Sequence, residues 1–177
     1  MQEHFILTNF FPDNLRKKLI EDCKPFLKKL SEEGKTEFPA YQSDNDLRWF
    51  EQFSDIHYAA DLCAQEYLQK KLRPDRSRCI MTQGKEDQYS MHNHPVDYVG
   101  IYYMNSHPSF ANGTEFKEYG FVEAPENSMV LFPGFLVHRP PVFNQKGFQR
   151  YSMSLNWNLK NLWKKEYIRC IGLPPYG

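Results

Sequence analysis

The 177-residue sequence lacks the features of several protein classes. No apolar run approaches the roughly 20 residues that a membrane-spanning helix needs. The N-terminal segment has neither a basic region nor a long apolar region, so we expect no signal peptide. The 22 basic and 22 acidic side chains balance, which removes any overall field that would attract nucleic acid or acidic lipid. We therefore expect neither a membrane nor a nucleic-acid partner.

Cysteine is scarce and scattered. The four cysteines, Cys23, Cys63, Cys79 and Cys170, form no C-x-x-C pair. This spacing argues against a zinc ribbon and is typical of buried free thiols in a reducing compartment, so we expect a cytoplasmic protein. Aromatic residues are abundant at 16%, and hydrophobic residues reach 41%, which indicates a β-rich core.

Hydrophobic spacing divides the chain into a helical first part and a strand-rich second part. Apolar residues three and four apart predict a helix from Pro12–Asp13 to Leu30, kinked or split at Pro25. A polar loop is expected through residues 34–46, and a second helix from residue 54 that stops before Arg73-Pro74. From Arg76 onward, short apolar runs between turn residues predict strands near 77–83, 89–92, 98–105, 114–116, 128–132, 136–138 and 150–158.

This order of elements predicts one α+β domain over residues 1–177. Residues 1–75 form its mainly helical part, residues 76–160 a small barrel or jelly-roll core, and residues 161–177 a C-terminal extension. We expect the helices to pack on the outside of the strands.

Two of the six histidines lie two residues apart, in Ser-Met-His-Asn-His-Pro at 90–95. On a strand, His92 and His94 point to the same face, and neutral imidazoles there can share a divalent metal ion. His138, at the end of the apolar segment 131–138, is the candidate third ligand. His4, His57 and His107 are expected to be ordinary surface or core residues.

The segment that begins at Arg150 alternates between polar and apolar residues, as a strand with two different faces does. One face carries Arg150, Ser152 and Ser154, and the other carries Tyr151, Met153 and Leu155. An unpaired arginine that faces a core is costly. The polar face is therefore either solvated or lines a pocket for a carboxylate, which the guanidinium fork matches.

Taken together, these motifs resemble the 2-oxoglutarate- and Fe(II)-dependent oxygenases. The resemblance covers roughly residues 78–158 and rests on H-x-H-P, G-I-Y-Y-M-N, G-T-x-F, L-F-P-G-F-L-x-H and R-Y-S-x-S-x-N in that order. It is greatest to a bacterial and phage branch that carries H-x-H-P, and looser to prolyl hydroxylases. The resemblance implies a double-stranded β-helix, a jelly-roll and cupin-like fold, and hydroxylation of an unidentified small molecule or peptide.

The same resemblance implies roles for individual residues. His92 and His138 would bind Fe(II), while Arg150, Ser152 and Tyr103 would hold the far carboxylate of 2-oxoglutarate. The family's usual carboxylate ligand, two residues after the first histidine, is replaced here by His94. Three arrangements are open: His94 is the second ligand, Asp97 takes that place, or His94 and Asp97 bind the metal while His92 does not. We favour His92, His94 and His138, with Asp97 orienting an imidazole.

Two other functions remain open at this point. One is a cupin-type metalloenzyme that does not use 2-oxoglutarate, and the other is a non-enzymatic jelly-roll binding module. The substrate is not readable from the sequence, although Trp49, Tyr98 and Phe110 can either line a pocket or serve in packing. Trp157 and Trp163 are expected to pack, and the basic cluster Lys70, Lys71, Arg73, Arg76 and Arg78 is expected at a helix end, where cations are favoured.

Overall fold

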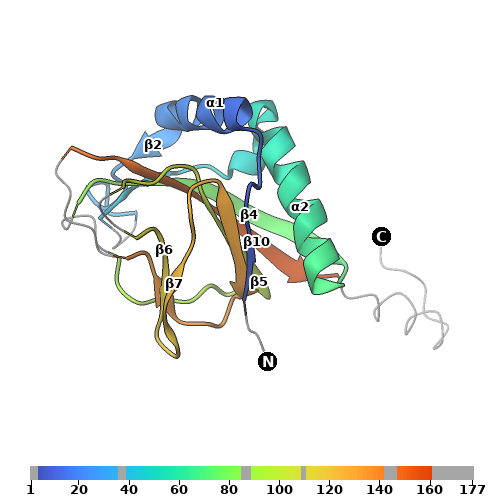
Figure 1. Ribbon diagram of the computed structural model, residues 1–177. Helices are drawn as coiled ribbons and strands as arrows, with labels where there is room; N and C mark the ends of the chain where they lie inside the picture. The colour runs from blue at the N-terminus through green and yellow to red at the C-terminus, as the bar shows by residue number, and fades with distance from the viewer. Residues whose placement is uncertain (1–3, 36–38, 85–88, 109–110, 142–146, 161–177) are drawn as a thin grey trace, which may run out of the picture.

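The computed structural model describes residues 4–35, 39–84, 89–108, 111–141 and 147–160. The expected extension at 161–177, with Trp163 and Cys170, lies outside these ranges, as does Phe110. Within them, a large antiparallel sheet carries two α-helices on one side and a small antiparallel sheet on the other (Figure 1). The large sheet has seven strands in the order β1-β8-β5-β10-β4-β3-β2, and the small sheet has the order β7-β6-β9.

The strands of the large sheet differ widely in length. In spatial order they are β1 (Phe5–Leu7), β8 (Ser128–Pro133), β5 (Tyr98–Tyr103), β10 (Arg150–Leu159), β4 (Leu72–Thr82), β3 (Tyr41–Ser43) and β2 (Leu27–Lys28). The small sheet consists of β7 (Gly120–Glu123), β6 (Gly113–Phe116) and β9 (His138–Arg139). The long strands β4 and β10 pair with each other, with one register shift between Leu155 and Trp157.

Both helices lie on the outer face of the large sheet, as expected. Helix α1 (Asp13–Cys23) ends where a 3-10 helix, Lys24–Phe26, begins, so Pro25 splits the predicted helix and its last part becomes β2. Short 3-10 helices at Leu47–Trp49 and Glu51–Phe53 lead into α2 (Ser54–Leu68). Neither α-helix of the described ranges is long and apolar enough to cross a membrane.

Alternation along the strands separates two buried clusters. Met153, Leu155 and Trp157 of β10 belong to the cluster that the helices cover. Val130 and Phe132 of β8 instead belong to a cluster between the two sheets, which the small sheet also supplies. The two faces of the large sheet therefore have different surroundings. The outer face packs against the helices, and the inner face borders the space between the two sheets.

Several predicted strands need correction. The segment 89–92 is not a strand; it contributes an isolated bridge between His92 and His138. The pairing does not extend, because the N–H of His94 donates to the carbonyl of Gly134. The strand expected at 136–138 is the short β9, and the loop expected at 34–46 contains β3. Strand β4 begins at Leu72, before Arg76, and β1, β3 and β7 were missed because three or four residues give no clear period.

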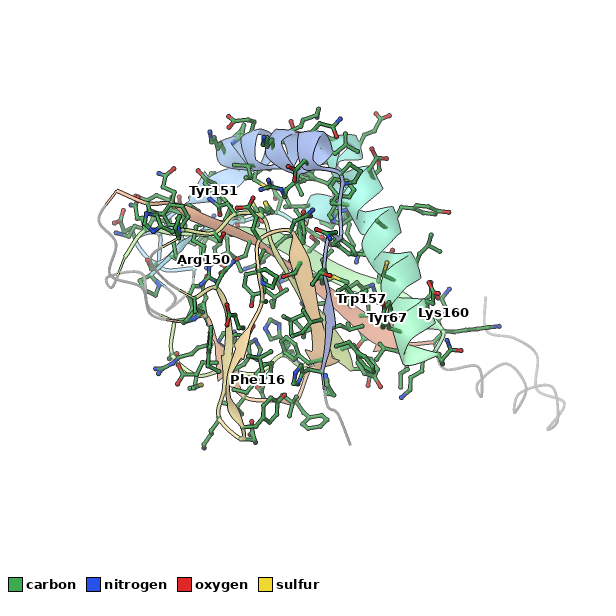
Figure 2. The ribbon with its side chains drawn as sticks, in the orientation of Figure 1. Tyr67, Phe116, Arg150, Tyr151, Trp157 and Lys160 are labelled. Atoms are coloured by element: carbon green, nitrogen blue, oxygen red, sulfur yellow. The ribbon has the colours of Figure 1, made fainter. Side chains whose placement is uncertain are left out.

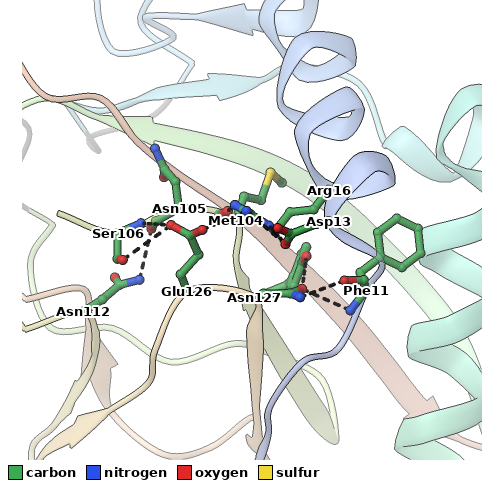
Figure 3. A network of polar contacts seen from close by, with 10 residues as sticks. Phe11, Asp13, Arg16, Met104, Asn105, Ser106, Asn112, Glu126 and Asn127 are labelled. Atoms are coloured by element: carbon green, nitrogen blue, oxygen red, sulfur yellow. Dashed lines mark hydrogen bonds and ion pairs between the residues drawn. The ribbon is translucent and has the colours of Figure 1, made fainter. Parts of the chain in front are cut away.

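A polar network ties the first helix to the end of β5 (Figure 3). Arg16 of α1 is almost buried, donates to the carbonyl of Met104, and forms ion pairs with Asp13 at 3.2 Å and Glu126 at 2.8 Å. Asn127, in a left-handed conformation at φ 58°, accepts a hydrogen bond from the Phe11 N–H and donates one to its carbonyl. These bonds fix the segment before α1 over the outer face.

Candidate metal site and cavity

Three histidines come together beside the small sheet. The metal-binding nitrogens of His92, His94 and His138 all lie within 4.8 Å of one another. The backbones of His92 and His138 exchange two hydrogen bonds, of 2.9 and 2.8 Å, and the His94 N–H donates to the Gly134 carbonyl at 2.9 Å. The 89–97 segment and the turn before β9 thus position the three rings. The structure brings together the three histidines of the favoured set, and their role as metal ligands stays a prediction.

Hydrogen bonds determine which nitrogen each ring offers. The Nδ1 atoms of His92 and His138 lie 2.9 Å from the carbonyls of Ser90 and Leu136. Because a carbonyl only accepts, these Nδ1 atoms carry the proton, and the ring lone pair lies on Nε2. The His94 Nε2 is buried without a hydrogen-bond partner in the described ranges. The grouped ring nitrogens and the unpartnered His94 Nε2 fit a divalent metal ion.

Burial keeps the three rings neutral. It lowers the pKa of His92, and it lowers the pKa of His94 to about 4 and that of His138 to about 3, with neighbouring histidines adding to the effect in the last two. All three are therefore in the neutral form that binds metals at pH 7, without competition from protons.

Asp97, the alternative ligand, lies apart from this group. Its side chain is exposed, and its Oδ2 accepts a hydrogen bond of 2.7 Å from the Leu159 N–H. Its backbone carbonyl accepts one of 2.9 Å from the Gly134 N–H. Asp97 thus joins the histidine segment to β10 and to the turn before β9.

The histidines open into a cavity of about 450 Å³ between the two sheets. This volume suits a small molecule. From β10 the cavity is lined by Arg150, Ser152, Ser154 and Asn156, the inner residues of the alternating pattern. Figure 2 shows the Arg150 side chain on the face of the large sheet turned away from the helices. The predicted division of β10 into a polar and an apolar face is therefore present.

Arg150 is a buried cation without a counter-ion in the described ranges. It is 2% exposed, and its Nε and Nη1 atoms are buried without hydrogen-bond partners there. Its guanidinium carbon lies 5.6 Å from the centre of the Tyr103 ring, and burial lowers its pKa. Leaving a buried charge unpaired is strongly unfavourable. A carboxylate in the cavity would remove this penalty.

Tyr103 of β5 and Ser152 of β10 carry hydroxyl groups on the same wall as Arg150. The Tyr103 hydroxyl hydrogen-bonds the Thr114 hydroxyl, and burial raises the pKa of Tyr103 to about 12. Ser152 is 3% exposed and stands opposite Tyr103 in the β10–β5 pair. The structure thus brings Arg150, Ser152 and Tyr103 to one wall of the cavity, with Thr114 as a neighbour whose contact the sequence did not reveal.

Other residues singled out in the sequence have different surroundings. Trp49 is 79% exposed and borders a separate, smaller hollow. Tyr98 packs on the helix side and accepts a hydrogen bond from Lys70. Trp157 is a core residue, as expected. Of the basic cluster, Arg76 and Arg78 belong to β4 and line the cavity, so placing all five at a helix end was wrong.

The remaining histidines lie apart from the three-histidine group. His57 is a buried residue of α2, His4 stacks on Phe116 and Tyr119, and His107 contacts Phe148. They are thus in the ordinary surroundings expected of them.

No family model and no curated protein matches the sequence. Solved structures match at low identity. A prolyl-4-hydroxylase from Pseudomonas putida matches with a TM-score of 0.67 and 15% identity over 91% of this chain and 95% of its own. HygX from Streptomyces hygroscopicus, with nickel, 2-oxoglutarate and hygromycin B bound, matches with a TM-score of 0.69 and 9% identity over 90% and 84%.

The similar structures include more than hydroxylases. SnoN, a non-heme alpha ketoglutarate dependent epimerase from nogalamycin biosynthesis, matches with a TM-score of 0.69 and 8% identity over 88% of this chain and 78% of its own. At these identities the likeness concerns the fold. The chain has the double-stranded β-helix fold of the 2-oxoglutarate-dependent non-heme oxygenases, with helices on the outside as predicted.

Proposed function

We propose that the chain is an Fe(II)-dependent oxygenase that uses 2-oxoglutarate and O2 to hydroxylate a small molecule or peptide. The observation that carries the proposal is that a group of three histidines and a buried arginine line the same cavity. A group of three neutral histidines calls for a metal ion, and the buried Arg150 calls for an anion. A keto acid with a second carboxylate meets both demands.

In this proposal His92, His94 and His138 hold Fe(II) through their Nε2 atoms. All three ligands are neutral, so the ion keeps its full double charge, one unit more than with a carboxylate ligand. That charge favours an anionic cosubstrate. The carbonyls of Ser90 and Leu136 would keep two of the rings in the required tautomer.

Arg150 would donate from Nε and Nη1 to the far carboxylate of 2-oxoglutarate, and the Ser152 hydroxyl would donate to the same group. Tyr103 supports the guanidinium with its ring and remains protonated at neutral pH. If its hydroxyl accepts from Thr114, its own proton is free for the carboxylate.

The metal would supply activation of O2 coupled to conversion of 2-oxoglutarate into succinate and CO2, with one oxygen atom entering succinate and the other a substrate C–H bond. The chain's own contribution is to place that bond and to exclude water. Val96, Ile80 and Ile101 provide apolar wall on the cavity, which limits the access of water to the reacting groups.

Two observations weigh against the alternatives. A cupin-type enzyme that does not use 2-oxoglutarate leaves the buried charge of Arg150 unexplained, and a binding module without a metal ion leaves the group of three histidines unexplained. We further propose a cytoplasmic location, which the free thiols of Cys23, Cys63 and Cys79 support.

The test is an anaerobic titration of the metal-free protein with Fe(II) and then with 2-oxoglutarate, followed by visible absorption. We expect a weak charge-transfer band from a chelated keto acid, and formation of succinate when O2 and a substrate are added. In Arg150→Met, Fe(II) should bind as in the wild type, while the affinity for 2-oxoglutarate falls by about tenfold or more.

Arg73→Met is the matched control, because Arg73 lies on the same strand pair but is exposed to solvent. It should bind both ligands as the wild type does. A wild-type protein that binds Fe(II) but gives no band with 2-oxoglutarate would refute the proposal. Unchanged 2-oxoglutarate affinity in Arg150→Met would refute the role of that residue.

A further inference from the structure

A second group of unsatisfied donors lies on the cavity wall, away from Arg150. The inner face of β4 presents Arg76, Arg78 and Ile80 to the cavity. Gln42 of β3 stands opposite Ile80, and Ser154 of β10 stands opposite Arg78. Directly opposite and diagonal neighbours on one face of a sheet are close enough to interact. Arg78 and Gln42 therefore form a single feature of the wall.

The contact between these two side chains fixes the direction of the amide. The Arg78 Nη1 donates to Gln42 Oε1 at 3.2 Å. Because a guanidinium only donates, the oxygen of Gln42 must face it and Nε2 must face elsewhere. Gln42 is 4% exposed, yet its Nε2 is buried without a partner, and so is the Nε of Arg78, in the part of the chain that is described. Leaving buried donors of this kind without an acceptor is costly.

Asp44 and Asp46, the described carboxylates nearest in sequence to Gln42, already have other partners. Asp44 pairs with Lys35 at 2.5 Å. Asp46 accepts hydrogen bonds from the N–H groups of Arg48 and Ser77, at 3.1 and 2.9 Å. In the described ranges Arg78 takes part in no ion pair, and burial together with Arg76 lowers its pKa. The wall thus holds a partly buried cation that lacks a counter-ion.

The described wall of the cavity carries more positive than negative side chains. Among the residues that the structure describes, the charged side chains of this wall at neutral pH are the cations Lys35, Arg76, Arg78 and Arg150 and the acid Asp75. The acid is partly engaged, since its Oδ1 accepts a hydrogen bond from Asn158. The complete chain has no net charge, so the described lining of the cavity is more positive than the chain as a whole.

Arg78 and Arg150 lie at separate positions along the strands. Arg150 stands opposite Thr82 and Ser154 opposite Arg78, so the backbones of the two arginines are separated by four residues along the strands, about 13 Å. The carboxylate carbons of a five-carbon diacid are about 5 Å apart at full extension. A cosubstrate held by Arg150 and the histidines would leave Arg78 and Gln42 free.

We infer that Arg78 and Gln42 form a second anion subsite, which binds a carboxylate of the primary substrate and directs the rest of that substrate across the cavity to the three histidines. This inference rests on the proposed function and names its substrate class: a small carboxylic acid, or a peptide bound through its C-terminal carboxylate. Ser154 and Asn156 border the subsite from β10.

The donor set favours a carboxylate over a phosphate. Arg78 Nε and Gln42 Nε2 can each serve one oxygen of a planar group with two acceptor oxygens. Phosphate sites in proteins commonly add several backbone N–H groups at a helix N-terminus or a glycine-rich loop. The wall here is formed by strands, whose N–H groups are engaged in the sheet.

The test uses calorimetry with a defined panel of probes. L-Amino acids and N-acetyl-L-amino acids, each paired with its carboxamide, are titrated into the protein loaded with Mn(II) and 2-oxoglutarate. We expect at least one acid to bind about tenfold more tightly than its amide. Arg78→Met should weaken that acid about tenfold and Gln42→Leu about threefold, with the affinity for 2-oxoglutarate unchanged within twofold.

Arg73→Met again serves as the control and should bind the acid as the wild type does. The inference is wrong if no acid of the panel is preferred to its amide, if inorganic phosphate competes better than every acid, or if Arg78→Met binds the acid normally. Repeating the titration without Mn(II) and 2-oxoglutarate separates the two proposals. If the wild-type protein binds neither Mn(II) nor 2-oxoglutarate, the proposed oxygenase function is wrong. If the wild type still binds an acid and Arg78→Met does not, the anion subsite is established independently.

Discussion

The substitution Gly134→Ala should damage the histidine group without touching a histidine. A Cβ atom at Gly134 would lie 2.1 Å from the Val96 carbonyl oxygen and 3.1 Å from that of His94. Carbon and oxygen atoms in close contact normally keep about 3.3 Å apart, so the 94–97 backbone must move by about 1 Å. It cannot move freely, because Gly134 also exchanges hydrogen bonds of 2.9 Å with His94 and Asp97.

A metal site tolerates ligand displacements much smaller than this shift of about 1 Å. Ligand distances are held within about 0.2 Å, and disturbing the groups that orient a ligand typically lowers metal affinity about 10- to 100-fold. We expect a loss of that size for Mn(II) in calorimetric titrations of Gly134→Ala, together with a loss of stability of about 1–3 kcal/mol in urea unfolding.

Gly100→Ala is the matched control. Its Cβ would lie 2.9 Å from the Trp157 ring and 3.0 Å from the Met129 sulfur, on the helix side of the sheet. It should lose a similar amount of stability, while the folded protein binds Mn(II) normally. If Gly134→Ala binds Mn(II) with wild-type affinity, or if Gly100→Ala loses metal binding equally, the role given to the Gly134 contact is wrong.

Three further outcomes are expected. Saturating Mn(II) should raise the melting temperature of the wild type but not of His138→Ala; an equal rise in both would contradict the three-histidine site. Burial lowers the pKa of His57 from 6.5 to about 4, so the unfolded chain binds more protons and stability should fall as pH drops from 6.5 toward 4. His57→Phe should remove roughly 2–3 kcal/mol of that fall in urea unfolding, and an unchanged pH profile would refute the assignment. Arg16→Met breaks a nearly buried ion-pair network and should cost about 2 kcal/mol without changing Mn(II) affinity; the reverse pattern would show that α1 affects the site.

The sequence contained enough information for the parts of the fold with a clear period. The alternation in residues 150–158 predicted both the strand and its two faces, and the spacing of apolar residues predicted two helices and the break at Pro25. The three-residue strands β1 and β3 are shorter than one reliable period, so they could not be recognised.

Candidate site residues were predictable where a motif lies within one segment. His92 and His94 are close in sequence, but their approach to His138 depends on a backbone bridge and on the turn at Gly134. The contact of Arg78 with Gln42 joins strands 36 residues apart and depends on the register of β3 against β4. No local pattern encodes such a register. The chemical roles given to these residues remain predictions that the proposed titrations test.

The two-faced construction of β4 and β10 has a consequence for how this protein can diverge. Neighbouring residues on these strands contact different surroundings, since Met153 and Leu155 meet the helices while Ser152 and Ser154 meet the cavity. A mutation at an inner position such as Ser154 or Asn156 therefore alters the cavity wall and leaves the packing beneath the helices intact. Selection can therefore change the lining of the cavity through every second residue of these strands, at little risk to folding.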